Sequence, residues 1–134
     1  MKIICHDIKA ITDCNAISDT ENKYGFKLPL EVAEFFNLNN GGTPDDRYFV
    51  AEEEEFELRS FLSFNEGDLN SIYKPMEYFQ KNTKGKIIPL GYDSFDNYFC
   101  MNLENGCIYF YDHEDELYYR IFDSFAELIA VLEN

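Results

Sequence analysis

The stretch from residue 86 to 114 constrains the fold most, because three β-prone runs follow one another with turn residues between them. We expect strands at Lys86–Leu90, Asn97–Leu103 and Cys107–Tyr111. Residues 104–106 hold an Asn-Gly pair, and both residue types tolerate the positive φ that tight turns need. The runs are rich in Ile, Tyr, Phe and Leu, which suit a pleated surface. The stretch is therefore predicted to be an antiparallel meander.

Side chains of a strand alternate between two faces. In the middle run Tyr98 shares a face with Cys100 and Asn102, and in the last run Tyr109 and Tyr111 share one. A face in water would carry polar residues instead of these tyrosines. Tyrosine has a large apolar body with a polar tip, so this face is either half covered or held for a partner.

The length and composition favour one folded domain, residues 1–134, with one core. The chain is 46% hydrophobic and 17% aromatic, and its apolar runs are too short to span a membrane. Helical patterns cluster towards the two ends of the chain and strand patterns in its middle. The expected class is α+β, with helices packed on an antiparallel β-sheet.

Two helices are expected early in the chain. The first has Thr12 or Asp13 as its cap and runs toward Tyr24, and the second runs from Pro29 to about Leu38. The apolar residues of the second helix recur at helical spacing, which predicts one buried face.

The last helix has a clear start, because Ser124 and Glu127 form a capping box before an apolar stripe. An edge strand is expected at Ile3 and Ile4, at the start of the chain.

The middle of the chain alternates between strand and helix patterns. Short strands are expected at Tyr48–Val50 and Tyr118–Phe122, and a longer half-buried strand at Phe56–Phe64. A helical pattern begins at Asp68, and Pro75 should start a new turn or kink that helix.

The charge is strongly negative, with 26 Asp and Glu against 11 Lys and Arg, a formal net charge of −15. Such a field repels phosphate backbones and anionic membrane surfaces, so we expect no direct nucleic-acid partner and no membrane partner. A basic protein is the natural partner. The alternative is that the charge serves solubility alone.

The cysteines predict neither a metal site nor a cofactor, because they form no C-x-x-C pair and the chain has only two histidines. We expect small buried thiols in a reduced cytoplasm, and a disulfide between two of them stays open. The first residues lack the long apolar core of a signal peptide, so export is not indicated. The cysteines are Cys5, Cys14, Cys100 and Cys107.

One cluster, residues 112–116, combines His113 with four carboxylates. A histidine among carboxylates can act as a general base or join a metal site, so a metal-dependent hydrolase is one interpretation. Consecutive residues point in different directions and no nucleophile accompanies them, which favours a solvated bend. Asp93 and Asp96 do not have the spacing of a calcium loop, and we expect them to cap a turn.

Several segments, in this order and spacing, resemble the SUKH superfamily, the Smi and Knr type domain, over nearly the whole chain. Two residues depart from the pattern: Phe110 stands where Trp is usual, and Tyr92 where a small or acidic turn residue is usual. The segments are Tyr24–Pro29, Phe35-Phe36, Asn39–Gly42, Ile88–Gly91, Asn97–Leu103, Gly106, Ile108–Glu114 and Ser124–Ile129.

The resemblance implies a cytoplasmic binding protein without catalysis. Many bacterial members of that superfamily are immunity proteins that neutralise a cognate polymorphic or contact-dependent toxin, often a nuclease, by occluding its active or substrate site. Other members serve as scaffolds or regulators in eukaryotic cells. An acidic chain would complement a basic toxin. The sequence leaves open whether it acts as a monomer or a homodimer.

The candidate partner-binding residues combine acidic side chains with aromatic ones, since an interface hot spot needs an aromatic centre with charged surroundings. The run at residues 52–55 is either an exposed loop or part of this surface, and the tyrosines are either core or contact residues. The candidates are Glu52, Glu53, Glu54, Asp93, Asp96, Tyr98, Tyr109, Tyr111, Asp112 and Glu114.

Overall fold

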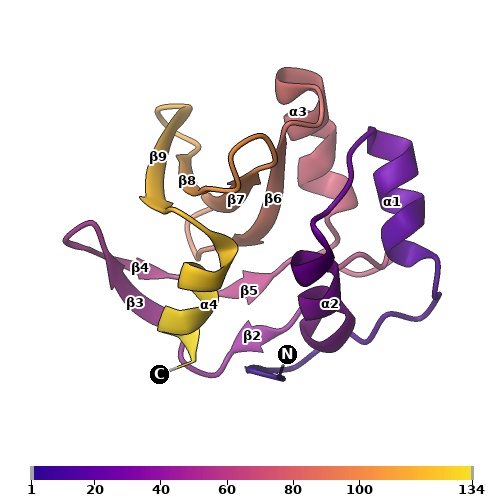
Figure 1. Cartoon of the computed structure of the whole chain (residues 1–134), viewed down its shortest axis with the longest axis horizontal. Coiled ribbons are helices and arrows are strands. Elements are labelled where there is room, and N and C mark those ends of the chain that lie inside the picture. Colours follow the sequence, from indigo (N-terminus) through magenta and orange to yellow (C-terminus); the bar gives the residue numbers. More distant parts are fainter. Residues whose placement is uncertain (1, 134) are drawn as a thin grey trace.

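The predicted meander forms the centre of a five-stranded antiparallel sheet in the computed structural model, which describes residues 2–133 (Figure 1). The strand order follows the chain, from β5 to β9, and each neighbouring pair is antiparallel. Helices and two small two-stranded sheets surround it, which confirms the α+β class. The strands of the large sheet are β5 (Ser60–Phe61), β6 (Ile87–Tyr92), β7 (Tyr98–Asn102), β8 (Ile108–Asp112) and β9 (Leu117–Phe122).

Two glycines shape this sheet. Gly106 closes the turn between β7 and β8 with a φ of 77°, the left-handed conformation that glycine adopts without a steric cost. A Cβ atom on Gly91 would lie 2.8 Å from the carbonyl oxygen of Ser60. Gly91 therefore allows the short strand β5 to approach β6.

The prediction of a single strand at Phe56–Phe64 is wrong, because this stretch contributes to two different sheets. β4 (Glu54–Glu57) pairs with β3 (Tyr48–Ala51) as a hairpin, whereas β5 pairs with β6. The chain crosses between the sheets at two adjacent residues. The amide of Leu58 donates to Arg47 O (2.8 Å), and the amide of Arg59 donates to Tyr92 O (2.8 Å).

The third sheet joins the start of the chain to residues that follow the second helix. β1 (Cys5–His6) pairs with β2 (Thr43–Pro44), so the edge strand lies just after the Ile3 and Ile4 expected for it. Ile4 is buried and Ile3 is exposed.

The first helix, α1 (Ala16–Tyr24), starts later than Thr12 or Asp13 predicts. The Asp13 carboxylate accepts a hydrogen bond from the Asn15 amide (2.9 Å) and forms a local turn instead of a helix cap. Gly25 ends the helix with a φ of 74°, and its amide donates to Glu21 O.

The other helices are α2 (Leu30–Asn39), α3 (Tyr73–Thr83) and α4 (Phe125–Leu132). The helix expected from Asp68 begins at Tyr73, because Ser71 forms a β-bridge with Ser63 and holds the preceding residues in a turn. Pro75 lies in the first turn of α3. Ser124 caps α4, with its Oγ accepting from the Glu127 amide (3.2 Å). Nowhere in residues 2–133 is a helix long and apolar enough to cross a membrane.

Both faces of the sheet are covered. Phe79 of α3 packs on Tyr98 and Tyr111, with ring centroids 5.7 and 5.3 Å apart. On the opposite face Phe49 of the β3–β4 hairpin contacts Phe99 (5.8 Å), and α4 lies against β3 and β9. In Figure 1 the hairpin extends to the left, whereas α1 and α2 lie to the right. A core of edge-to-face phenylalanines joins α2, β5 and α4: Phe35, Phe36, Phe61, Phe64 and Phe125.

Asn40 is a buried polar residue that connects the chain across long distances. Its Nδ2 donates to Lys9 O (2.7 Å) and Ser63 Oγ (2.9 Å), and its Oδ1 accepts from the Phe64 amide (2.9 Å). A buried polar side chain with its hydrogen bonds made costs little, whereas removing it leaves its partners unsatisfied.

The cysteines are all free thiols. Cys5, Cys100 and Cys107 are buried, as expected, but Cys14 is exposed in the loop before α1. Burial raises the pKa of the Cys5 thiol to about 12, and burial likewise raises that of Cys100.

Candidate functional site

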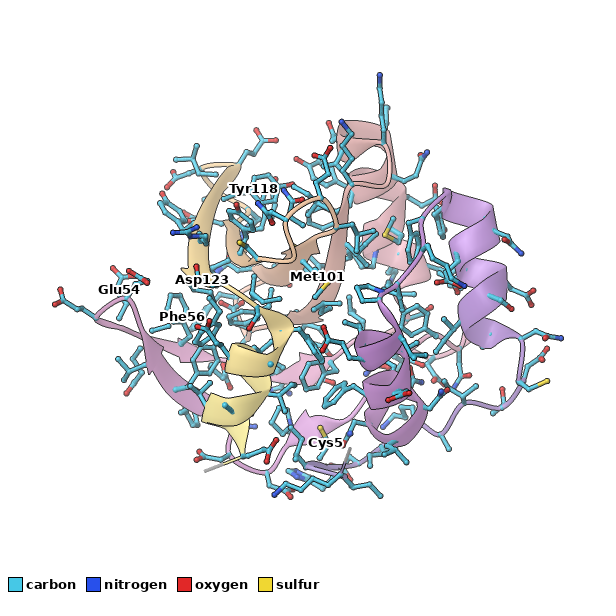
Figure 2. All side chains as sticks on the ribbon, viewed as in Figure 1. Cys5, Glu54, Phe56, Met101, Tyr118 and Asp123 are labelled. Atoms are coloured by element: carbon cyan, nitrogen blue, oxygen red, sulfur yellow. The ribbon has the colours of Figure 1, made fainter. Side chains whose placement is uncertain are left out.

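The tip of the β3–β4 hairpin is built from carboxylates in an unusual conformation. Glu52 and Glu53 have φ of 51° and 64°, the left-handed region that two-residue hairpin turns require and that glycine or asparagine usually fills. Glutamate pays a steric cost there. Figure 2 shows Glu54 at the outer end of the hairpin, away from the body of the protein. The hairpin therefore projects negative charge into solvent at a cost in backbone strain.

The hairpin is held on the sheet by an aromatic pair. The ring of Phe56 in β4 lies 5.0 Å from the ring of Phe110 in β8, centroid to centroid. Both rings are half-buried. Phe49, on the neighbouring strand, stacks on Phe56 (5.7 Å) and anchors the hairpin to the buried side. The Phe56–Phe110 pair is thus firmly positioned and partly open to solvent.

Grooves run along both sides of this aromatic pair. The first, of about 660 Å³, is lined by Glu52, Glu54 and Asp112 as well as by both rings. The second, of about 610 Å³, is lined by Glu54 and Asp93 together with both rings. We call the two grooves and their carboxylates the acidic surface. Its members are Glu52, Glu54, Glu55, Phe56, Glu57, Asp93, Phe110 and Asp112, and the same grooves are also lined by Arg47, Arg59 and Arg120.

Four of the ten candidate partner-binding residues therefore meet on the acidic surface: Glu52, Glu54, Asp93 and Asp112. Glu53 lies beside them in the hairpin turn and is exposed. The pairing of the strands explains why Asp112 lies close to Phe110. Phe110 is paired with Phe99 across β7, while Asp112 ends the same strand two residues later.

The three tyrosines do not line the two grooves, and of the alternatives left open for them, core or contact, Tyr111 takes the first because it is buried. Tyr98 and Tyr111 are paired across β7 and β8 on the face that α3 covers. Tyr111 is 5% exposed, and its hydroxyl shares a hydrogen bond of 2.7 Å with that of Tyr78. Burial and this hydrogen bond raise the pKa of Tyr111. Tyr109 is half-buried on the same face.

Asp96 and Glu114 lie in turns at one end of the sheet, and both are exposed. Asp96 has a φ of 67°, and Glu114 follows Asp112, whose carboxylate accepts from the Glu114 amide (3.0 Å). These positions place them beyond the ends of the strands and outside the two grooves.

Asp93 organises the turn between β6 and β7. Its Oδ1 accepts from the amides of Phe95 (2.8 Å) and Asn97 (2.9 Å), and its Oδ2 accepts from Asn97 Nδ2 (3.0 Å). Asn97 Oδ1 in turn lies 2.8 Å from His113 Nδ1. Asp93 thus caps its turn, and the His113 ring is engaged with an amide oxygen.

His113 is held through one nitrogen of its ring. Across residues 2–133 no group of three or more His, Cys, Asp and Glu side chains is placed to hold a metal ion. The amide oxygen of Asn97 can only accept a hydrogen bond, so His113 Nδ1 carries the proton and Nε2 is the nitrogen able to accept one. What the acidic surface can do chemically is bind: it combines apolar rings with carboxylates, of which Glu57 is paired with Arg47 (3.4 Å) while Glu52 and Glu54 form no ion pair within residues 2–133.

Sequence reasoning missed the exposed aromatic residues next to the acidic surface. Phe95 is 73% exposed in the turn capped by Asp93, and it lines the second groove. Tyr119 on β9 is paired with Phe110 and lines the first. The signal for Phe95 was available, since a phenylalanine between Ser94 and Asp96 in a polar turn has no core to enter.

Comparisons with known proteins give two findings. The model of the SMI1 / KNR4 family (SUKH-1) matches residues 12–131. A SPbeta prophage-derived uncharacterized protein, YokK, of Bacillus subtilis (strain 168) is 33% identical over 69 residues. That match covers 48% of this chain and 36% of the relative, so the chain spans about a third of the length of that curated relative.

Proposed function

The chain belongs to the SMI1 / KNR4 family (SUKH-1), and from this premise we propose that it is an immunity protein that neutralises a cognate protein toxin. Family membership confirms the resemblance drawn from the sequence and supports an immunity-type role in general terms. The finer proposal is that the partner is a basic toxin domain of nuclease type, met in the cytoplasm. Binding occludes its active or substrate site.

The acidic surface is the observation that carries this proposal. Specific interfaces place aromatic anchors at the centre and charged residues at the rim, and here Phe56 and Phe110 lie between carboxylates on both sides. A toxin that cleaves nucleic acid must present a positive groove to phosphates. Carboxylates placed around an apolar centre match such a groove in charge and steer its approach.

The strain at the hairpin tip supports the same proposal. Glycine or asparagine at positions 52 and 53 would satisfy the turn at a lower cost, yet both positions hold glutamate. A costly conformation at an exposed, charged tip is typical of a functional site. We assign Glu52, Glu53 and Glu54 to the contact with the toxin.

Inhibition by occlusion needs neither catalysis nor a cofactor. The protein acts by the free energy of binding alone, so affinity and the position of the contact decide its activity. The acidic surface supplies both charge and an apolar anchor for that purpose.

The experiment is coexpression with the protein encoded by the neighbouring gene, measuring the growth of the producing cells. The test variant combines Glu52→Gln, Glu54→Gln and Asp112→Asn. The matched control combines Asp19→Asn, Glu31→Gln and Glu34→Gln, exposed carboxylates on α1 and α2, and removes the same three charges. We expect the wild type and the control to protect cells and the test variant to lose protection.

Equal protection by the test variant and the wild type would place the contact elsewhere. If the neighbouring protein proves harmless yet binds through the acidic surface, the chain is a scaffold or regulatory module. Killing that is unaffected by the wild-type chain would refute the immunity role for that pair.

A further inference from the structure

Three cations gather around one cavity of this acidic protein. It lies beside β1, β2, β5 and β6, has a volume of about 450 Å³, and is lined by Lys9, Arg47 and Arg59. Three of the 11 Lys and Arg residues thus meet in one place on a chain of net charge −15. Asp7 is the one carboxylate among its described lining residues.

Lys9 is held in position by backbone contacts. Its amide donates to Asn40 O (2.8 Å), and its carbonyl accepts from Asn40 Nδ2 (2.7 Å). Its side chain lies against Gly41, where an added Cβ would come within 2.9 Å of Lys9 Cγ. The ammonium group donates to the backbone oxygen of Asp7 (3.2 Å), and no carboxylate of residues 2–133 forms an ion pair with it.

Arg59 is also fixed through its backbone, because its amide donates to Tyr92 O (2.8 Å) where the chain crosses from the hairpin to the large sheet. Its guanidinium forms no ion pair within the described part of the chain. Arg47 differs, since its Nε lies 3.4 Å from Glu57 Oε2. Lys9 and Arg59 therefore remain as the two uncompensated cations of the cavity.

We propose that this cavity binds a phosphate group, held between Lys9 and Arg59. The planar guanidinium matches two oxygens of a tetrahedral oxyanion, and the ammonium supplies a compact positive charge. Asn70 also lines the cavity, and its Oδ1 is a buried acceptor that lacks a donor from residues 2–133. That oxygen is shielded from solvent, so it is not a contact for an ion in the cavity.

The negative charge of the whole chain does not prevent this binding at physiological salt. Charges more than about 8 Å away are largely screened at 0.15 M ionic strength. The cations that line the cavity then decide which ions enter it. The cavity shares Arg47 and Arg59 with the second groove of the acidic surface, but phosphate binding in it requires no toxin.

The test is a titration of the free protein with inorganic phosphate, followed by NMR amide shifts at constant ionic strength of about 0.15 M, with chloride as the reference anion. We expect saturable shifts at residues around Lys9, Gly41 and Arg59. Arg59→Gln or Lys9→Gln should weaken binding about tenfold, the usual effect of losing one charge-assisted hydrogen bond. Thermal unfolding of each variant verifies that it is folded.

Lys74→Gln and Lys81→Gln are the matched controls, since each removes one positive charge from an exposed position on α3. They should change phosphate affinity less than about twofold, because they lie outside the cavity. Shifts that phosphate and chloride produce equally, or the same loss in the controls as in Arg59→Gln, would overturn the proposal.

A second titration, with glycerol 3-phosphate, distinguishes the source of the phosphate group. Tighter binding than that of inorganic phosphate, lost in Arg59→Gln, would indicate a small phosphorylated molecule. Equal or weaker binding would indicate the free ion. Either result supports the phosphate site. If no phosphate binds, the toxin-binding proposal still stands, because that proposal is tested by the protection of cells.

Discussion

Replacing the hairpin tip by Glu52→Asn with Glu53→Gly is expected to stabilise the fold while weakening partner binding. Both residues have positive φ, which costs a residue other than glycine about 1–2 kcal/mol. Asparagine tolerates this region, and glycine removes the clash but loses about 0.5–1 kcal/mol through the flexibility of the unfolded chain. The net gain expected in the free energy of unfolding is about 1–2 kcal/mol.

Thermal unfolding followed by circular dichroism measures this gain. For a chain of this size, about 1 kcal/mol corresponds to a rise in Tm of about 3–5 °C. The charge control is Glu52→Gln with Glu53→Gln, which removes the same two charges and keeps the side-chain atoms that cause the strain. Relief of repulsion along residues 52–55 affects both variants equally. If the two variants have the same Tm, backbone strain at the tip is not the cause and the reasoning fails.

Three further predictions concern the body of the protein. Asn40→Ala should lower the free energy of unfolding, measured by urea titration, by about 3 kcal/mol, because the three hydrogen bonds of its side chain are lost. The control Asn37→Ala, at an exposed position, should cost under about 0.5 kcal/mol, and equal losses in the two variants would contradict the role of Asn40. Ellman's reagent should titrate one thiol quickly, that of Cys14, and Cys14→Ser should abolish this phase while a persistent fast phase would refute it. Burial raises the pKa of Tyr111 above the usual value of about 10, so the contribution of this residue to stability is full below pH 10 and is lost as the pH rises further. Tyr111→Phe should therefore make Tm fall less steeply above pH 10. If Tm falls as steeply with pH in the variant as in the wild type, Tyr111 is not a cause of the fall.

Local signals in the sequence were sufficient for much of the fold. The Asn-Gly turn at residues 105–106 and the alternating runs beside it predicted the meander, and Ser124 predicted the start of the last helix. These signals depend on conformations within a few residues, so they need no knowledge of the rest of the chain.

The break between β4 and β5 could not be read in the same way. Apolar residues alternate from Phe56 to Phe64, and this pattern is the same whether the strand stays in one sheet or crosses to another. The crossing depends on Leu58 pairing with Arg47 and Arg59 with Tyr92, which are contacts between distant segments.

The candidate site was predicted only in part, because part of it also depends on contacts between distant segments. Most carboxylates lie at a protein surface, so Glu52, Glu54 and Asp112 were found from charge alone. Which face of the meander α3 covers is a tertiary property, and it decides that Tyr98 and Tyr111 are beneath a helix whereas Phe110 is at the surface.

The most direct measurement is the Kd of the chain for the toxin encoded by the neighbouring gene as ionic strength is raised from about 0.05 to 0.5 M. Contact through the acidic surface predicts a Kd that rises steeply with salt. It also predicts a weaker complex with a shallower salt dependence for the variant that combines Glu52→Gln, Glu54→Gln and Asp112→Asn. A Kd that is independent of salt, or the same for this variant and the wild type, would contradict the account.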